Sequence, residues 1–259
     1  MSLSVITSPN GLFAAIALAT CLLTTAWPAQ AARVIGYVRD TATQRYLYTE
    51  VHEQSLASDG AVLTGVTTYY DPQGREIARK TLDYRANRTV PVYRMDMPAL
   101  RYAEGISSNT PQAVLFKRDR DQEERKTLPL GDGLVAADAG FNHLLQDQLP
   151  ALRKGDTLRF GLIVAGRTDS YRFRASKVDE QVVDGQTTLR IMVEPDSMLR
   201  MVVPPITLAY SLKDRRLLSY QGTSNILDSD TGKVYQKISI VYGGTPPSEA
   251  LLPATVPAR

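Results

Sequence analysis

The sequence predicts a mainly β protein, an antiparallel meander that forms an open, half-closed β-barrel with one main helix packed on its concave face. Three observations favour this fold class. Runs rich in Val, Ile, Leu, Tyr and Thr recur about every ten to fifteen residues, with Asp, Gly, Pro and Asn between them. Many of these runs alternate apolar and polar side chains. Only one segment has helical spacing of its apolar residues.

Turn signals divide the first half of the chain into strands. Ser58-Asp59-Gly60 and Asp71–Gly74 combine residues that fix or permit the backbone angles of a tight turn. The strands predicted between these turns are Val34–Val38, Tyr46–His52, Val62–Tyr70 and Glu76–Tyr84. Further on, Lys117–Lys126 mixes five basic with four acidic residues, which indicates a solvated hairpin or loop.

The second half alternates more regularly. Side chains two residues apart in a strand point to the same face, so each alternating set marks a buried face. These sets are Leu158, Phe160, Leu162 and Val164; Tyr171, Phe173 and Ala175; Leu189, Ile191 and Val193; Ile206, Leu208, Tyr210 and Leu212; and Val234, Gln236, Ile238, Ile240 and Tyr242. Arginines occupy the opposite faces of several strands. One apolar and one wet face are typical of an open antiparallel sheet that curls around its core.

Ala136–Leu152 is the predicted helix, because Phe141, Leu144, Leu145 and Leu149 follow near-helical spacing. Asp138 is the predicted N-cap, and Pro150 is expected to end the helix or to begin a second short turn. A lone helix in a protein of many strands suggests a plug that shields the apolar interior of the half-closed sheet from water.

The chain begins with a predicted signal peptide over residues 1–31. Leu12–Ala26 is uncharged and mostly apolar or small, Trp27-Pro28 follows, and Ala29-Gln30-Ala31 is an A-x-A cleavage signal. The apolar stretch is too short to span a membrane, so no transmembrane span is expected after cleavage. We expect a single antiparallel β domain over residues 32–242, a Pro-rich disordered tail over residues 243–259, and a location in the periplasm.

Two alternatives to cleavage remain open. Leu18-Ala19-Thr20-Cys21 resembles a lipobox, which would anchor the protein through an acylated Cys21, although Thr fits poorly before the cysteine. The leader could also stay uncleaved, since Met1–Gly11 contains no Lys or Arg. Cleavage after Ala31 would leave 228 residues without cysteine, because Cys21 is the only one. Stability would then come from apolar burial and hydrogen-bonded sheet rather than from disulfides.

Composition and motifs argue against several functions. A net charge of +3, from 30 basic and 27 acidic residues, does not indicate a nucleic-acid partner. His52 and His143 are the only histidines, and no zinc-binding spacing occurs, so we expect structural histidines and no metal or other cofactor. Nucleophile elbows and phosphate-binding glycine motifs are also absent. We therefore expect no enzymatic activity, although a hydrolase that uses two carboxylates stays open.

Leu217–Asp230 is the most distinctive local stretch. Gly222 interrupts a strand pattern there, which predicts a bulge or a close approach of backbone. Ser224 and Asn225 could complete a local hydrogen-bond network, and contact with a ligand is the alternative.

The cleaved leader, the meander, the helix followed by Gly155-Asp156, and the run Leu218–Ile226 together resemble uncharacterised periplasmic families of bacterial domains of unknown function. The architecture proposed for those families is similar to the half-barrels of outer-membrane lipoprotein carriers and receptors. The resemblance covers the pattern from Val34 to Tyr242. It implies a hydrophobic cavity and transfers no catalytic residue.

These observations favour a non-enzymatic binding or carrier protein for an apolar or amphipathic ligand, such as a lipid, an acyl chain or a lipoprotein segment. The candidate lining residues of its cavity are Phe160, Leu162, Val164, Leu189 and Ile191. The same residues could instead fill a dry core. An interaction module of envelope assembly, which would bind an envelope protein through an exposed strand edge, is the alternative function.

Overall fold

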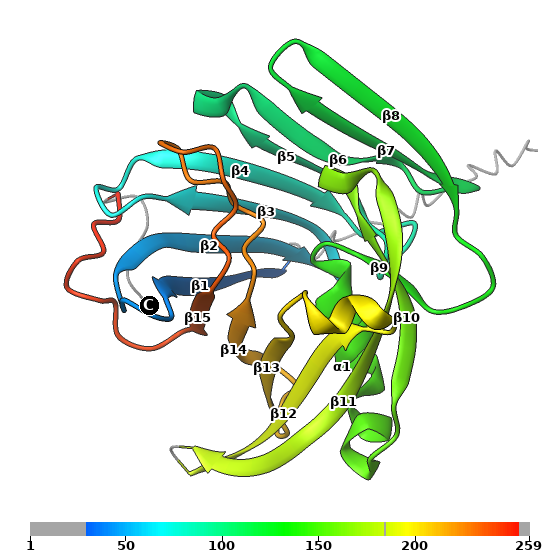
Figure 1. The fold of residues 1–259 in the computed structure, drawn as a ribbon. Coiled ribbons are helices and arrows are strands. Elements are labelled where there is room, and N and C mark those ends of the chain that lie inside the picture. The colour runs from blue at the N-terminus through cyan, green and yellow to red at the C-terminus, as the bar shows by residue number, and fades with distance from the viewer. Residues whose placement is uncertain (1–29, 184, 254–259) are drawn as a thin grey trace, which may run out of the picture.

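The computed structural model describes residues 30–183 and 185–253, which form one sheet of 15 strands (Figure 1). The strands are β1 (Gln30–Asp40), β2 (Tyr46–Leu56), β3 (Val62–Tyr70), β4 (Glu76–Asp83), β5 (Val92–Met97), β6 (Tyr102–Ser108), β7 (Gln112–Asp119), β8 (Gln122–Pro129), β9 (Val135–Ala137), β10 (Leu158–Val164), β11 (Asp169–Val183), β12 (Gln186–Pro195), β13 (Ile206–Ser211), β14 (Leu217–Gly222) and β15 (Ile238–Tyr242). A single α-helix, α1 (Gly140–Lys154), occurs in the described part of the chain. The predicted fold class is confirmed.

The sheet consists of two meanders that meet in the middle. Strands β1 to β8 follow one another outwards in sequence order, and β15 back to β9 do the same on the other side. The antiparallel pair β1–β15 joins the two meanders, with Val38 opposite Ile240. All neighbouring strands are antiparallel except β9 and β10, which are parallel. The edge strands are therefore β8 and β9.

The two ends of the curved sheet approach each other without forming a backbone ladder. The 3-10 turn η2 (Ala165–Arg167), which follows β10, contacts β6 and β7. Side chains link β8 to the start of β11: Thr168 hydrogen-bonds to Glu124, and Lys126 forms an ion pair with Asp169 at 3.1 Å. We call these two contacts the seam. The barrel is thus half-closed, because no strand ladder joins edge strands β8 and β9 in the described part of the chain.

Helix α1 lies inside the curve of the sheet (Figure 1). It packs on β10–β13, where Leu144, Leu145, Leu149 and Leu152 are almost completely buried. These residues and the inward-facing residues of the strands form what we call the helix-side core. Its other buried members are Ala136, Phe160, Ala175, Leu189, Ile191, Val193, Leu208 and Tyr210.

The helix differs from the prediction at both ends. Ala136 and Ala137 belong to β9, and Asp138 does not cap the helix, because the N-cap position is Ala139. Asp138 has a φ of 45° and directs its carboxylate to another partner, described below. Pro150 does not end the helix, which continues to Lys154 and stops at Gly155 with a φ of 101°. Burial of Leu149 and Leu152 on either side offsets the hydrogen bond that proline lacks.

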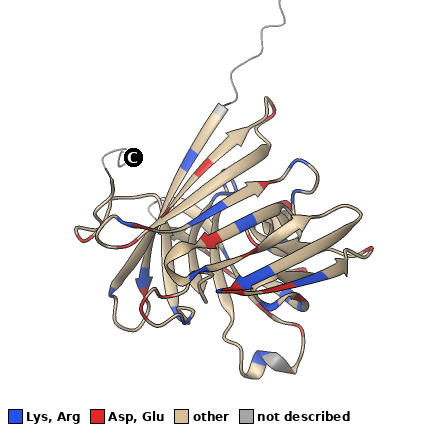
Figure 2. Ribbon diagram, turned by 90° about the horizontal axis from the view of Figure 1, so that it is seen from above, with Lys and Arg blue, Asp and Glu red and all other residues tan. Residues whose placement is uncertain are grey.

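The mixed-charge segment 117–126 forms the β7–β8 hairpin, as predicted, and β8 is exposed along almost its whole length. Figure 2 shows that basic and acidic residues are interspersed over the strands and hairpins of the described chain. Such mixing is typical of a solvated surface. No helix of the described part is long and apolar enough to cross a membrane.

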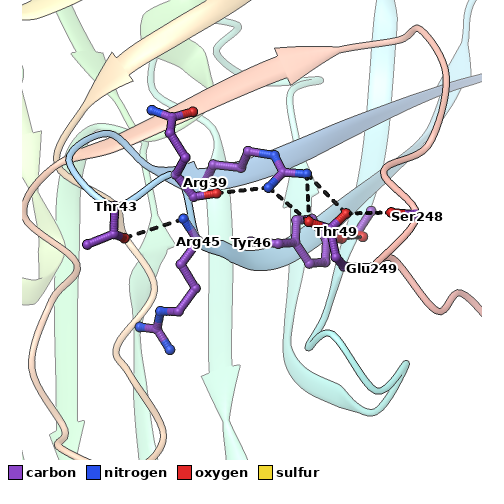
Figure 3. Close-up of polar contacts among 8 residues, drawn as sticks. Arg39, Thr43, Arg45, Tyr46, Thr49, Ser248 and Glu249 are labelled. Carbon is purple, nitrogen blue, oxygen red and sulfur yellow. Dashed lines mark hydrogen bonds and ion pairs between the residues drawn. The ribbon is translucent and has the colours of Figure 1, made fainter.

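Residues 243–253 belong to the segment that the sequence predicts to be disordered, and they contact β1 and the turn between β3 and β4. The Gly243 amide donates to the Ile35 carbonyl at 2.8 Å, and Leu252 packs against the cluster around Ile35. Arg39 holds Glu249 at 3.2 Å, next to the hydrogen bond between Tyr46 and Thr49 (Figure 3). Residues 1–29 of the predicted leader at 1–31, which include Cys21, lie outside the described residues, whereas Gln30 and Ala31 form the start of β1.

Candidate functional site

A cavity of about 1180 Å³ lies between helix α1 and the inner face of the curved sheet. Its wall is built from β1–β6 on one side and from α1, β10 and β13–β15 on the other. Ligand-binding cavities in proteins measure about 300–1,000 Å³, so the space is large enough for a sizeable molecule.

One side of the cavity is mainly apolar, and we call it the apolar wall. It consists of Phe141, Leu162, Val164, Ile206, Leu208 and Leu217. Most of these side chains are only partly buried, since they pack on the helix-side core and still border open space. An apolar side chain that keeps accessible surface inside a protein is where an apolar ligand would gain most from contact.

The five candidate lining residues divide between two places. Leu162 and Val164 line the cavity as part of the apolar wall. Phe160, Leu189 and Ile191 belong to the helix-side core, where each is at most 4% exposed. The alternating pattern predicts that all five side chains face the inside of the sheet. In the structure, helix α1 covers β11 and β12, whereas the C-terminal end of β10, which carries Leu162 and Val164, borders the cavity.

The opposite side of the cavity is rich in tyrosine and ionisable residues, and we call it the polar wall. Its tyrosines are Tyr48, Tyr69, Tyr84, Tyr93, Tyr220 and Tyr242. Tyr48 and Tyr69 pack edge to face, with ring centroids 6.1 Å apart. Burial raises the pKa of each of these hydroxyls, so they stay neutral.

A buried ion pair lies at the centre of the polar wall. Lys80, on β4, donates to both carboxylate oxygens of Asp138 at 2.6 and 2.7 Å, and the two side chains are only 5% and 7% exposed. Asp138 also accepts a hydrogen bond from the Ala139 amide at 2.6 Å. The pair therefore ties β4 to the residue that precedes helix α1.

Glu50 and His52 project from neighbouring same-face positions of β2. Glu50 Oε1 and His52 Nε2 are 3.2 Å apart, within ion-pair distance, but their orientation is not that of a hydrogen bond. Neither atom has another hydrogen-bond partner among the described residues. Burial alone would raise the pKa of Glu50, but the His52 charge and the Tyr242 hydroxyl outweigh it and hold the pKa below its usual value.

Glu104, on β6, is the third carboxyl group of the polar wall. It lies deep within the protein but retains accessible surface, because it borders the cavity. Tyr102 donates a hydrogen bond to its Oε2 at 2.5 Å. Gly166 in η2 allows this approach, since a Cβ there would lie 2.2 Å from the same oxygen. Burial, followed by the charge of Asp138, raises the pKa of Glu104, and the Tyr102 hydrogen bond only partly opposes the increase.

The segment 217–230 contributes directly to the cavity. Gly222 is the last residue of β14, and the predicted close approach is to the Tyr220 hydroxyl, which would be 2.8 Å from a Cβ at Gly222. Ser224 accepts the Ile226 amide at 2.8 Å and hydrogen-bonds to Tyr48, as the predicted local network requires. Asn225 Nδ2 lies 3.5 Å from Asp138 Oδ2, so this segment also reaches the buried ion pair.

Both histidines border the cavity and have protein partners. His52 Nδ1 is 3.0 Å from the Thr67 hydroxyl. His143, on α1, stacks edge-on against Tyr84 at 4.9 Å and hydrogen-bonds to Gln146 at 3.2 Å. Burial, followed by the charge of Arg88, lowers the pKa of His143.

The residues that line the cavity can recognise a ligand by its shape, by its charge and by contact with aromatic rings. Among the described residues, no group of His, Cys, Asp and Glu could hold a metal ion. Glu50, Glu104 and Asp138 are among the carboxyl groups that line one cavity, which is one requirement of an acid-pair hydrolase. Lys80 neutralises Asp138, whereas Glu104 has a hydrogen bond from the neutral Tyr102.

Sequence reasoning missed the polar wall. Glu50, Lys80 and Glu104 come from three strands that are far apart in the chain, and each is a single ionisable residue within an alternating run. One signal was available: a tyrosine and ionisable residues occupy alternate positions in β2, at Tyr48, Glu50 and His52.

Comparison with known proteins gives few matches. No family model matches the chain, and no curated protein matches it. Among solved structures, it is similar to a β-barrel-like protein of the domain of unknown function DUF1849 from Brucella abortus. The two are 10% identical, the match covers 83% of this chain and 95% of that one, and the TM-score is 0.41.

Proposed function

We propose that this protein is a non-enzymatic binding or carrier protein for an amphipathic ligand, such as a lipid, an acyl chain or a lipoprotein segment. The cavity of about 1180 Å³, with an apolar wall opposite a polar wall, carries the proposal. An acyl chain would bury its surface against Leu162, Val164 and Ile206, and its head group would contact the polar wall. The predicted leader favours a role in the periplasm.

The first experiment is native mass spectrometry and solvent extraction of the purified protein, to detect a co-purifying lipid. Displacement of the neutral fluorophore N-phenyl-1-naphthylamine by alkyl compounds then measures affinity. Val164→Trp should fill part of the cavity and weaken binding by about tenfold, since lost chain contacts amount to one or two methylene groups. Val182→Trp, on an exposed position of β11, is the matched control and should bind normally. Absence of both bound lipid and displaceable probe would contradict the proposal.

The carboxyl groups that line the cavity support a second candidate, a carboxylate-dependent hydrolase. Glu50 and Glu104 would be its acid pair, because Asp138 is neutralised by Lys80. If the wild-type protein chemically changes a bound ligand during incubation and Glu104→Gln abolishes this change, a hydrolase is favoured over a carrier protein. The interaction module is less well supported, because edge strand β8 carries four charged residues, and charge on an edge opposes strand addition.

A further inference from the structure

The charges of the polar wall do not cancel. Lys80 is the one buried lysine among the described residues, and Asp138 neutralises it with two short hydrogen bonds. The carboxyl groups of Glu50 and Glu104 remain. The charge of Lys80 acts to lower the pKa of each of them, so both lie near the same ion pair. His52 lies 3.2 Å from Glu50, and Arg33, Arg88 and Arg216 also border the cavity. Arg88 and Arg216 form ion pairs with Asp147 and Asp214. Among the described residues, neither Glu50 nor Glu104 forms an ion pair with a lysine or an arginine, so the polar wall has an excess of carboxyl groups.

Two of these carboxyl groups have unused binding capacity. The Glu50 side chain is 6% exposed, and its Oε1 has no hydrogen-bond partner among the described residues. An unpaired oxygen on a buried carboxylate is costly, and a ligand that donates a proton or a positive charge would relieve that cost. Glu104 retains accessible surface at the cavity, and the neutral Tyr102 is its one side-chain hydrogen-bond partner in the part of the chain that the structure describes.

Aromatic rings surround the same space. Six tyrosines line the cavity, and the faces of such rings attract cations. The protein already uses this property, because Lys80 Nζ lies 5.9 Å from the ring centroid of Tyr69 and 6.0 Å from that of Tyr93. Tyr220 and Tyr242 lie deep but keep accessible surface, so their rings remain available to a ligand.

We propose that the polar wall binds a positively charged head group, an ammonium or a substituted ammonium, and that the ligand is a cationic amphiphile. This inference rests on the proposed binding function and specifies its ligand class. The head group would lie between Glu104, Glu50 and the rings of Tyr220 and Tyr242. The apolar chain would extend along Leu162, Val164 and Ile206.

The test compares three ligands of equal chain length, each below its micelle concentration: dodecyltrimethylammonium, dodecanol and dodecanoate. Affinity is measured by displacement of N-phenyl-1-naphthylamine. We expect the ammonium compound to bind at least tenfold more tightly than dodecanoate, because a desolvated cation gains roughly 1–2 kcal/mol from aromatic faces in addition to its attraction to carboxylates. Dodecanol should bind with intermediate affinity.

Variants of the polar wall then test which residues cause the preference for the ammonium compound. Glu104→Gln should reduce ammonium binding by about tenfold and leave dodecanol binding unchanged. Glu123→Gln, on the exposed strand β8, is the matched control and should change neither. If Glu104→Gln does not fold, Tyr220→Leu provides a second test, since it removes an aromatic face but keeps an apolar side chain.

The outcomes separate this inference from the proposed function. Equal or tighter binding of dodecanoate, or an ammonium preference that survives both Glu104→Gln and Tyr220→Leu, would overturn the cationic ligand class while the binding function stands. Failure of all three ligands to displace the probe from the wild-type protein would instead overturn the binding function itself.

Discussion

The helix-side core and the polar wall are two inner surfaces of the same sheet with opposite solutions to burial. In the helix-side core, α1 covers β10–β13 and the inward residues are aliphatic or aromatic and almost fully buried. On β2–β6 the cavity is lined by tyrosines together with Glu50, Lys80 and Glu104, and most of these side chains are buried as well. The difference teaches that this fold buries aliphatic residues under its helix and polar, hydrogen-bonded residues beside its cavity.

Breaking the Lys80–Asp138 pair should have the largest effect on stability. Lys80→Ala would leave a buried carboxylate without its partner, so we expect a loss of about 3–5 kcal/mol in the free energy of unfolding. Urea denaturation measures it. The double variant Lys80→Met with Asp138→Asn removes both charges and should recover much of the loss. A loss below about 1 kcal/mol in the single variant would show that the pair is not a structural part of the polar wall.

The next largest expected effect is a difference in stability loss between side-chain truncations in the helix-side core and on the apolar wall. Ile191→Ala, in the helix-side core, leaves a cavity in a filled region and should cost about 2–5 kcal/mol. Val164→Ala, on the apolar wall, removes a methyl pair that already borders open space and should cost less than about 1.5 kcal/mol. Denaturant midpoints of the two variants give the comparison. Equal costs would mean that the apolar wall is as well packed as the core.

The smallest expected effect concerns pH and Glu104. Because its pKa is raised above the usual 4.5, the folded protein holds this proton to higher pH than the unfolded chain does. The contribution of Glu104 to stability therefore falls as the pH rises from about 4.5 through the folded-state pKa, and stays low above it. Glu104→Gln removes the titration, so its stability relative to the wild type should increase over this range. A difference that does not change with pH would contradict the buried position of Glu104.

The sequence could predict the fold because alternation and turn residues are local. The strands around Leu189–Val193 and the 117–126 hairpin follow from patterns of a few residues, and both are present. The same patterns cannot distinguish a filled core from a cavity wall, since both need apolar residues at every second position. Leu162 and Leu189 have equivalent patterns, and only the position of α1 places one at the cavity and the other in the core.

The helix boundaries were wrong for a related reason. Asp138 has the sequence features of an N-cap, but a lysine 58 residues away takes its carboxylate. That contact depends on the path of the whole sheet, which no local pattern contains. For the same reason the polar wall could not be assembled from the sequence, although its tyrosines were visible.

The seam has a consequence for how the barrel opens. Everywhere else, separating two strands means breaking a ladder of backbone hydrogen bonds. The sheet ends are joined instead by the Glu124–Thr168 and Lys126–Asp169 side-chain contacts and by apolar packing of Ala137, Ile163 and Ala165 against β4–β7. An exposed ion pair such as Lys126–Asp169 contributes roughly 0–1 kcal/mol. Breathing motions should therefore concentrate between β8 and β11, where the wall can part and reclose while the rest of the molecule keeps its hydrogen bonds.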